Sequence, residues 1–317
     1  MQRIPINDLG RIYAQYGDRF ESQIKRVLKS GRWLNGQQTE EFCHAFASSV
    51  GVAHCIGVGN GTDALELAMR TLLSIDPRFC SDATDMDPAE IVTVANAGGY
   101  TTTACYLNGC VPVYADIEPH TLLMSISSAV AAISERTAAV VATHLYGGLV
   151  DVPALRRAMD SAGYKDVPIL EDCAQAHGLS GCGGNAGAFG KIATYSFYPT
   201  KNLGAVGDAG AVVTNDDICA ERVRQLQQYG WRHKYTVNMA LGRNSRLDEI
   251  QAATLKVLLP DLKSANERRR HILGLYDQAV NAPNRFARSE CGTVAHLAVL
   301  IAEDRASFRH HLNNRGI

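Results

Sequence analysis

The 317-residue sequence lacks several features that would assign a chain to a class at once. It has no excess of one charge, with 31 basic against 32 acidic residues, so no net field favours nucleic acid or an anionic membrane. No apolar run reaches the roughly 18 residues that a membrane-spanning helix needs. The N-terminal stretch MQRIPINDLGRIY carries charges and has no apolar segment typical of a secretion signal. We therefore expect no nucleic-acid partner and no membrane partner.

The nine cysteines are scattered, and no two of them form a C-x-x-C pair. An odd number without regular spacing is typical of reduced thiols in the cytoplasm rather than of a disulfide framework. Cys173 and His177 could be two ligands of a metal, but neither belongs to a second spaced pair, so we expect no metal site. The sequence thus predicts a cytoplasmic protein with reduced thiols.

The first 215 residues contain a regular alternation of strand-like and helix-like stretches. Seven apolar runs have the length of strands: HCIGVG, EIVTVAN, VPVYADI, AAVVATHL, VPILED, ATYSFY and GAVVTN. Stretches with helical period, such as ALELAMRTLLS and VPALRRAMDSAG, lie between them. Continuous apolar strands that alternate with helices predict a mainly parallel sheet covered on both faces.

The pattern changes in the last third of the chain. Residues 246–280 have a long helical pattern that Pro260 should break. After residue 281 the pattern weakens to a short apolar run, AHLAVLIA, and a helix from Asp304 to Asn314. This part predicts a second, smaller α/β layer. The polar stretch 75–90 contains two prolines and predicts a surface loop.

The stretch VGNGTDALELAMRTLL (58–73) could bind a phosphate. Gly59 and Gly61 permit a tight turn between a strand and a helix that begins near Thr62. Free N–H groups at a helix N-terminus bind phosphate readily. Alternatively, Thr62 or Asp63 simply caps the helix.

The stretch VPILEDCAQAHG (167–178) delivers two carboxylates, Glu171 and Asp172, at the end of an apolar strand. Ligands of open α/β sheets bind at that edge. Because side chains alternate along a strand, only one of the two acids can face such a site. Alternatively, this is an ordinary strand end, with Gln175 and His177 as ordinary polar residues.

The stretch SFYPTKNLGAVGDAGAVVT (196–214) holds one lysine, Lys201, before three closely spaced glycines. A lysine that binds a carbonyl compound needs an amine of lowered pKa, which partial burial provides. Glycine lets the backbone pass close to a flat ligand. A solvated loop lysine is the alternative. The nearby stretch SGCGGNAGAFG (180–190) predicts a glycine-rich loop rather than a dinucleotide site.

The order and content of these motifs resemble the DegT/DnrJ/EryC1/StrS family of pyridoxal-phosphate-dependent sugar aminotransferases. The resemblance extends from SGRWLNG through GNGTDALELA, HLYGGLVDVPAL and LEDCAQAHG to GRNSRLDEIQAATL, and so covers most of the chain. It implies an aspartate-aminotransferase-like large domain (the type I fold of pyridoxal-phosphate enzymes) over residues 14–245. It also implies a small C-terminal α/β domain over residues 246–317, onto which residues 1–13 could pack.

The same resemblance implies the cofactor, pyridoxal 5'-phosphate, and the residues that hold it. Lys201 matches the catalytic lysine that binds the cofactor covalently, and Asp172 the carboxylate that pairs with its ring nitrogen. Gln175 matches the polar residue near its phenolic oxygen. The residues that match the phosphate site are Gly61, Thr62, Asp63, Ser196 and, reaching into the neighbouring subunit, Asn244. A residue shared in this way implies a homodimer with shared active sites.

The reaction implied by the resemblance is transamination of a nucleotide-linked keto sugar by an amino acid, usually glutamate. The wording around Lys201 is most similar to the branch that aminates C3 of dTDP-linked 3-keto-6-deoxyhexoses, and a 4-keto sugar is the alternative. Relatives with histidine in place of this lysine act as dehydratases, so Lys201 favours transamination. A relative that binds the cofactor but is catalytically impaired or regulatory is a further alternative.

The sequence departs from the family pattern in two places. The position that usually stacks on the cofactor ring falls on Gly98, with Tyr100 nearby, so no stacking residue is assigned. The small domain of the family usually continues for some tens of residues beyond the stretch that matches HLNNRGI, where this sequence stops. The expected small domain is therefore incomplete.

Overall fold

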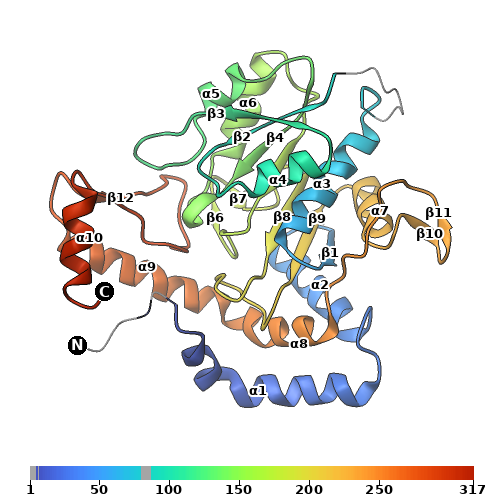
Figure 1. Ribbon diagram of the computed structural model, residues 1–317, viewed down its shortest axis with the longest axis horizontal. Helices are drawn as coiled ribbons and strands as arrows, with labels where there is room; N and C mark the ends of the chain where they lie inside the picture. The colour runs from blue at the N-terminus through green and yellow to red at the C-terminus, as the bar shows by residue number, and fades with distance from the viewer. Residues whose placement is uncertain (1–4, 6, 80–86) are drawn as a thin grey trace.

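The computed structural model describes residues 5, 7–79 and 87–317, and its centre is a seven-stranded sheet (Figure 1). The sheet order is β1-β9-β8-β5-β4-β2-β3. The strands are β1 (His54–Val58), β2 (Glu90–Val94), β3 (Val111–Ala115), β4 (Thr137–Thr143), β5 (Ile169–Asp172), β8 (Ile192–Ser196) and β9 (Gly210–Thr214). All seven coincide with the predicted apolar runs. Only β9 runs antiparallel to its neighbours, so the sheet is mainly parallel, as predicted.

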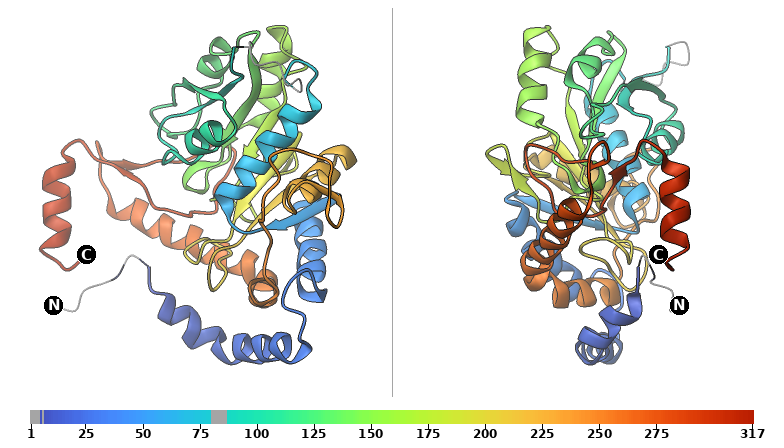
Figure 2. Two further views of the ribbon diagram at one scale, coloured as in Figure 1. Left: turned by 45° about the vertical axis from the view of Figure 1, so that its right-hand side comes forward. Right: turned by 90° about the vertical axis from the view of Figure 1, so that its left-hand side faces the viewer.

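Helices cover both faces of the sheet, as Figure 2 shows from two further directions. One face carries α3 (Gly61–Ile75), α4 (Tyr100–Leu107) and α7 (Asp217–Leu226). The other carries α2 (Gln37–Val50), α5 (Ile126–Ala131), α6 (Val152–Ser161) and α8 (Glu249–Leu258). The apolar runs therefore bury both sides of their strands, which explains why they lack alternation.

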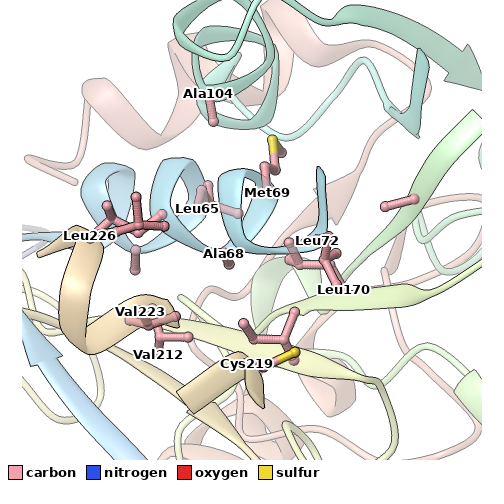
Figure 3. Close-up of a cluster of buried hydrophobic side chains, with 14 of the residues drawn as sticks. Leu65, Ala68, Met69, Leu72, Ala104, Leu170, Val212, Cys219, Val223 and Leu226 are labelled. Carbon is pink, nitrogen blue, oxygen red and sulfur yellow. The ribbon is translucent and has the colours of Figure 1, made fainter. Parts of the chain in front are cut away.

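Helix α3 is the centre of the first layer. Its side chains pack toward α4 on one side and toward α7 and the sheet on the other (Figure 3). Asn60 caps the helix by accepting a 2.8 Å hydrogen bond from the backbone N–H of Asp63. The expectation that Thr62 or Asp63 supplies the cap is therefore wrong, because the side chain one residue before the helix already accepts that N–H.

A long helical region follows the sheet, and it breaks where predicted. Helix α8 ends at Leu258, Pro260 lies in the 3-10 turn Leu259–Asp261, and α9 (Leu262–Ala279) continues. The helix α1 (Leu9–Ser30) packs along α8 near the bottom of Figure 1, and the sequence analysis did not identify it. The predicted division into residues 14–245 and 246–317 stays a prediction, as does the packing of residues 1–13, part of which lies outside the described residues.

The segment after α9 differs from its prediction. A strand was expected over residues 295–302, but only β13 (Leu300–Ile301) forms, paired with β12 (Arg285–Phe286), before α10 (Arg305–Asn313). Ala295 has a φ of 47°, which ends extended structure there. Instead, the N–H of Val294 donates to Gly147 O at 2.9 Å, which attaches the segment to the loop after β4.

Two short hairpins form two-stranded sheets of their own. One joins β6 (Ser180–Gly181) to β7 (Gly184–Asn185), within the predicted glycine-rich loop, and another joins β10 (Trp231–His233) to β11 (Thr236–Val237). Within the described residues, no helix has the length and apolar character needed to cross a bilayer. The predicted loop at 75–90 lies partly outside the described residues.

One pair of cysteines corrects the expectation of reduced thiols. Cys182, in the glycine-rich loop, forms a disulfide with Cys291 across 109 residues of sequence. The spacing argument missed this bond because folding, rather than sequence proximity, brings the two cysteines together. The free thiols among the described residues are Cys43, Cys55, Cys105, Cys110, Cys173 and Cys219. The cytoplasmic location stays a prediction.

Candidate active site

The two residues predicted to do the chemistry lie near the carboxyl ends of neighbouring parallel strands. Asp172 is the last residue of β5, and Lys201 lies in the loop that follows β8. This loop makes a tight turn, in which the N–H of Lys201 donates to Tyr198 O at 2.8 Å. A Cβ on Gly204 would lie 2.4 Å from Pro199 O, so the turn that carries Lys201 requires glycine at 204.

The amine and the carboxyl influence each other electrostatically. Burial lowers the pKa of Lys201, and the Asp172 carboxylate partly opposes that shift. Burial raises the pKa of Asp172, while the N–H of Ala174, at 3.1 Å, and the charge of Lys201 oppose the rise. The structure therefore places a half-buried amine and a buried acid within electrostatic reach at one edge of the sheet.

The adjacent acid, Glu171, points to the opposite face of the sheet. Its carboxylate accepts hydrogen bonds from the N–H groups of Gly187 (2.9 Å), Phe189 (2.8 Å) and Gly190 (2.6 Å). Burial alone would raise the pKa of Glu171, but the hydrogen bonds from His144 and from this loop bring the pKa below its ordinary value. The expectation that only one of the two acids faces the site thus matches the geometry.

His144 is a buried residue that sequence reasoning missed. Its Nδ1 accepts the N–H of Val150 at 3.1 Å, so Nε2 carries the proton and donates to Glu171 at 2.9 Å. Its own backbone N–H donates to Asp172 O at 3.0 Å. His144 and Glu171 therefore fix the position of the strand end that presents Asp172. His144 begins the motif HLYGGLVDVPAL and Glu171 lies in LEDCAQAHG, but the motifs do not show that the two residues bond to each other, because they lie 27 residues apart in the sequence.

The predicted phosphate residues come together where α3 begins. A Cβ added to Gly61 would lie 2.5 Å from Ser196 Cβ, so the helix start packs directly on the end of β8. The first N–H groups of α3, at Gly61 and Thr62, have no partner within the helix. They point out of the positive end of the helix dipole, beside the Ser196 hydroxyl.

Asp63 has a different arrangement from the other predicted phosphate residues. Its N–H is used by Asn60, and its carboxylate accepts a 2.6 Å hydrogen bond from Ser245 Oγ and pairs with Arg243 at 3.4 Å. The described contacts of Asp63 therefore anchor the segment around Asn244 rather than an anion. Asn244 itself is exposed between these two anchored residues.

The side-chain oxygen of Gln175 already has a hydrogen-bond partner. Its Oε1 accepts the N–H of Tyr146 at 2.6 Å, which leaves the Nε2 group free to donate to a ligand. Tyr146 has a φ of 60° and lies in the 3-10 turn after β4. That turn also receives the C-terminal segment, because Leu297 N–H donates to Tyr146 O at 3.2 Å.

A chain of amides next to Lys201 fixes a second histidine that sequence reasoning missed. Asn266 Nδ2 donates to His177 O (2.8 Å), and Asn202 Nδ2 donates to Asn266 Oδ1 (2.8 Å). Asn202 Oδ1 must then accept from His296 Nδ1, at 2.9 Å. His296 is thus held with its proton on Nδ1. Burial and the charges of Lys201 and Arg269 lower the pKa of His296 to about 3.

Comparison with known proteins identifies the family of this chain. Residues 15–317 match the model of the DegT/DnrJ/EryC1/StrS aminotransferase family. The chain belongs to this family. The predicted family and its α/β fold are therefore confirmed, and the prediction of a sugar aminotransferase is confirmed at the level of the family.

Relatives within this family are named sugar transaminases. A dTDP-3-amino-3,4,6-trideoxy-alpha-D-glucose transaminase of Micromonospora megalomicea subsp. nigra is 42% identical over 80% of this chain, which spans 64% of that relative. A protein of the same name from Streptomyces venezuelae is 38% identical over 99% of the chain and 80% of its own length. The chain therefore spans about two thirds to four fifths of these relatives.

The structure of S. venezuelae DesV in complex with a ketimine intermediate has the same fold. The TM-score is 0.90 at 36% identity, over all of this chain and 82% of DesV. The DegT/DnrJ/EryC1/StrS family thus accounts for the order of the motifs, and the roles of single residues remain predictions.

Proposed function

We propose that the chain transfers the amino group of an amino acid to a nucleotide-linked keto sugar, with pyridoxal phosphate as cofactor. The observation that carries the proposal is the placement of Lys201 and Asp172 at one sheet edge, each shifting the pKa of the other. Membership of an aminotransferase family supports dependence on pyridoxal phosphate. A lysine and a buried acid at one sheet edge suit that cofactor because it carries an aldehyde and a basic ring nitrogen.

The residues present fit the three polar ends of pyridoxal phosphate. Gly61 and Thr62 would hold the phosphate through their backbone N–H groups, with Ser196 beside them. Gln175 would donate its free Nε2 group to the phenolic oxygen, since its Oε1 is already bonded to Tyr146. Asp172 would keep the ring nitrogen protonated by ion pairing.

When bound, pyridoxal phosphate supplies an electron sink for the negative charge that forms at the amino-acid carbon. Lys201 has two tasks. Its side-chain amine would hold the cofactor at the aldehyde, and the same amine would act as the base that moves a proton at the reacting carbon. Burial favours this second task because the lowered pKa leaves a larger fraction of the amine unprotonated. The Glu171–His144 pair holds the strand end that positions Asp172.

For the substrate, we propose a dTDP-linked 3-keto-6-deoxyhexose, with glutamate as amino donor. The names of the two transaminases at 42% and 38% identity support amination at C3. A 4-keto sugar is the alternative. A panel of 3-keto and 4-keto nucleotide sugars, assayed with glutamate, separates the two, because the preferred substrate should have the larger kcat/KM.

We further propose a homodimer with shared active sites. Asn244 is exposed, while its neighbours Arg243 and Ser245 are fixed to the first turns of α3. An exposed polar side chain on a rigid segment can reach a second subunit. Mixing the inactive variants Lys201→Ala and Asn244→Ala should restore part of the activity through hybrid dimers, whereas two independent monomers would restore none.

The spectrum of the loaded protein tests the proposed reaction. Wild-type chain should take up pyridoxal phosphate with a visible absorbance band that shifts when glutamate is added. Lys201→Ala should lose that band and the covalent attachment on borohydride reduction. A band without a shift would favour the cofactor-binding relative that lacks turnover. A chain that takes up no pyridoxal phosphate would refute the proposal.

A further inference from the structure

The free thiols of the described residues fall into two groups. Cys43 and Cys55 are half-buried and keep some exposure to solvent. The others are buried, namely Cys105, Cys110, Cys173 and Cys219. Burial raises the pKa of all four buried thiols, so very little of the reactive thiolate forms there.

Cys43 and Cys55 come together where α2 packs against the edge strand β1 (Figure 1). Because side chains alternate along a strand, Cys55 and Gly57 lie on the same face of β1. A Cβ on Gly57 would lie 3.4 Å from Cys43 Sγ, so the thiol on the helix reaches this same face. Both cysteines also pack against one hydrophobic cluster, which includes Phe42 and Leu247.

The two thiols interact directly. The hydrogen bond between them lowers the pKa of Cys43 and raises the pKa of Cys55 well above its ordinary value, so the Cys55 thiol is the donor. The N–H of Gly57 and the charge of Arg224 also lower the pKa of Cys43, and burial opposes them. Two donors and a cation therefore stabilise a thiolate at Cys43, with a second thiol in contact with it.

We propose that Cys43 and Cys55 form a peroxide-reactive thiol pair, which a hydroperoxide converts into a second disulfide. The Cys43 thiolate attacks one oxygen of the hydroperoxide, the O–O bond breaks, and Cys43 becomes a sulfenic acid while the other oxygen leaves as water or an alcohol. The Cys55 sulfur then loses its proton, attacks the Cys43 sulfur and releases water. The two thiols lose two electrons in total, and the peroxide gains them. The inference does not depend on the proposed function.

Hydrogen peroxide, added to the pyridoxal-phosphate-loaded chain, tests the pair. The remaining thiols are alkylated, and each cysteine is then located by peptide mass spectrometry with and without reduction. The peptides that carry Cys43 and Cys55 should become linked at least about tenfold faster than Cys105 or Cys110 is oxidised, since the thiolate fraction changes roughly tenfold per unit of pKa. Cys105 and Cys110 are an internal control, because the N–H of Cys110 donates to Cys105 O at 2.9 Å and both thiols are buried.

Substitution separates the two roles. Cys55→Ser should leave a sulfenic acid on Cys43 that a 1,3-diketone traps, whereas Cys43→Ser should abolish the fast reaction. A second measurement needs no variant. Phenylarsine oxide bridges two neighbouring thiols, so in the folded wild type it should protect both Cys43 and Cys55 from alkylation, and a small dithiol should reverse the protection.

Four results would overturn the inference. One is a wild-type chain in which peroxide produces no link between Cys43 and Cys55. Another is oxidation of Cys105 or Cys110 at the same rate. The third is a link that forms only between two chains, seen as a covalent dimer on a non-reducing gel. The last is phenylarsine oxide that protects neither or only one of the two thiols.

Discussion

The central sheet and the segment after α9 both reach the candidate active site, but different interactions hold them. Strand β5 is buried along its whole length, and β8 is buried except at Ser196. Within residues 280–317, only Val294 and Ala295 are buried. That segment is attached by a disulfide, by backbone bonds to the loop after β4, and by His296.

The site residues are therefore positioned in two different ways. Apolar burial fixes Asp172 and the start of the Lys201 loop, because close packing on both faces leaves the strands one arrangement. A few discrete links fix His296 beside Asn202, and each link can be removed without disturbing the sheet. The site thus combines a rigid side with a side whose position depends on single bonds.

Truncation of one leucine in each region should give the largest difference in stability between the two regions. Leu67 in α3 is 0% exposed, whereas Leu297 in the C-terminal segment is 42% exposed. Leu67→Ala should lower the free energy of unfolding by about 2–5 kcal/mol, because a buried cavity is created. Leu297→Ala should change it by less than about 0.5 kcal/mol. Denaturant unfolding followed by circular dichroism measures both, and equal losses would contradict the contrast.

Reduction of the disulfide should have the next largest effect. Cys182–Cys291 closes a loop of 109 residues, and loss of such a bond lowers stability by about 2–4 kcal/mol. A reducing agent should lower the melting temperature and increase hydrogen exchange in residues 285–301 before exchange in the sheet. The double variant Cys182→Ser, Cys291→Ser should not respond to the reducing agent. Equal thiol counts with and without reduction would refute the bond.

Sequence patterns predicted the central sheet well and the segment after α9 poorly. All seven sheet strands and the break at Pro260 follow from local signals, namely continuous apolar runs and a residue that cannot continue a helix. The short strand at 300–301 and the contact of Val294 with Gly147 depend on where another part of the chain lies. Periodicity within one segment carries no such information.

The site residues divide in the same way. Lys201 and Asp172 lie in motifs that can be read along the chain. His144, Asn202 and His296 come from three separate segments, and only the folded chain shows their partners, which are Glu171 for His144 and Asn202 for His296. Ordinary polar side chains of this kind give no signal in a single sequence.

Acidification should lower the free energy of unfolding as Glu171, on the sheet side of the site, becomes protonated. Its folded-state pKa is lowered, so its stabilisation is present above the ordinary pKa of about 4.3 and is lost as the pH falls through the folded-state value. Glu171→Gln should cost about 1–3 kcal/mol at neutral pH, because the amide presents an N–H group to backbone donors. It should also flatten the loss of stability in acid.

Urea unfolding at several pH values tests this expectation. The exposed Glu135 is the matched control, since Glu135→Gln should preserve both the stability at neutral pH and its loss in acid. If the stability of Glu171→Gln fell with pH as that of the wild type does, the Glu171 carboxylate would not account for the loss of stability in acid.

Substitution of Tyr100 should give the smallest effect, and it tests whether this side chain contacts the cofactor. A Cβ on Gly98 would lie 2.9 Å from Tyr100 Cε2, so the tyrosine ring occupies the space that a side chain at 98 would take. The ring is 59% exposed and is therefore free to stack on a flat ligand. Tyr100→Ala should weaken binding of pyridoxal phosphate by about tenfold at most, since a ring contact contributes roughly 0.5–1.5 kcal/mol. Tyr100→Phe should bind as wild type, and Tyr106→Ala, an exposed tyrosine on the same helix, is the control. An absorbance titration in which Tyr100→Ala matches wild type would show that the Tyr100 ring does not contact the cofactor.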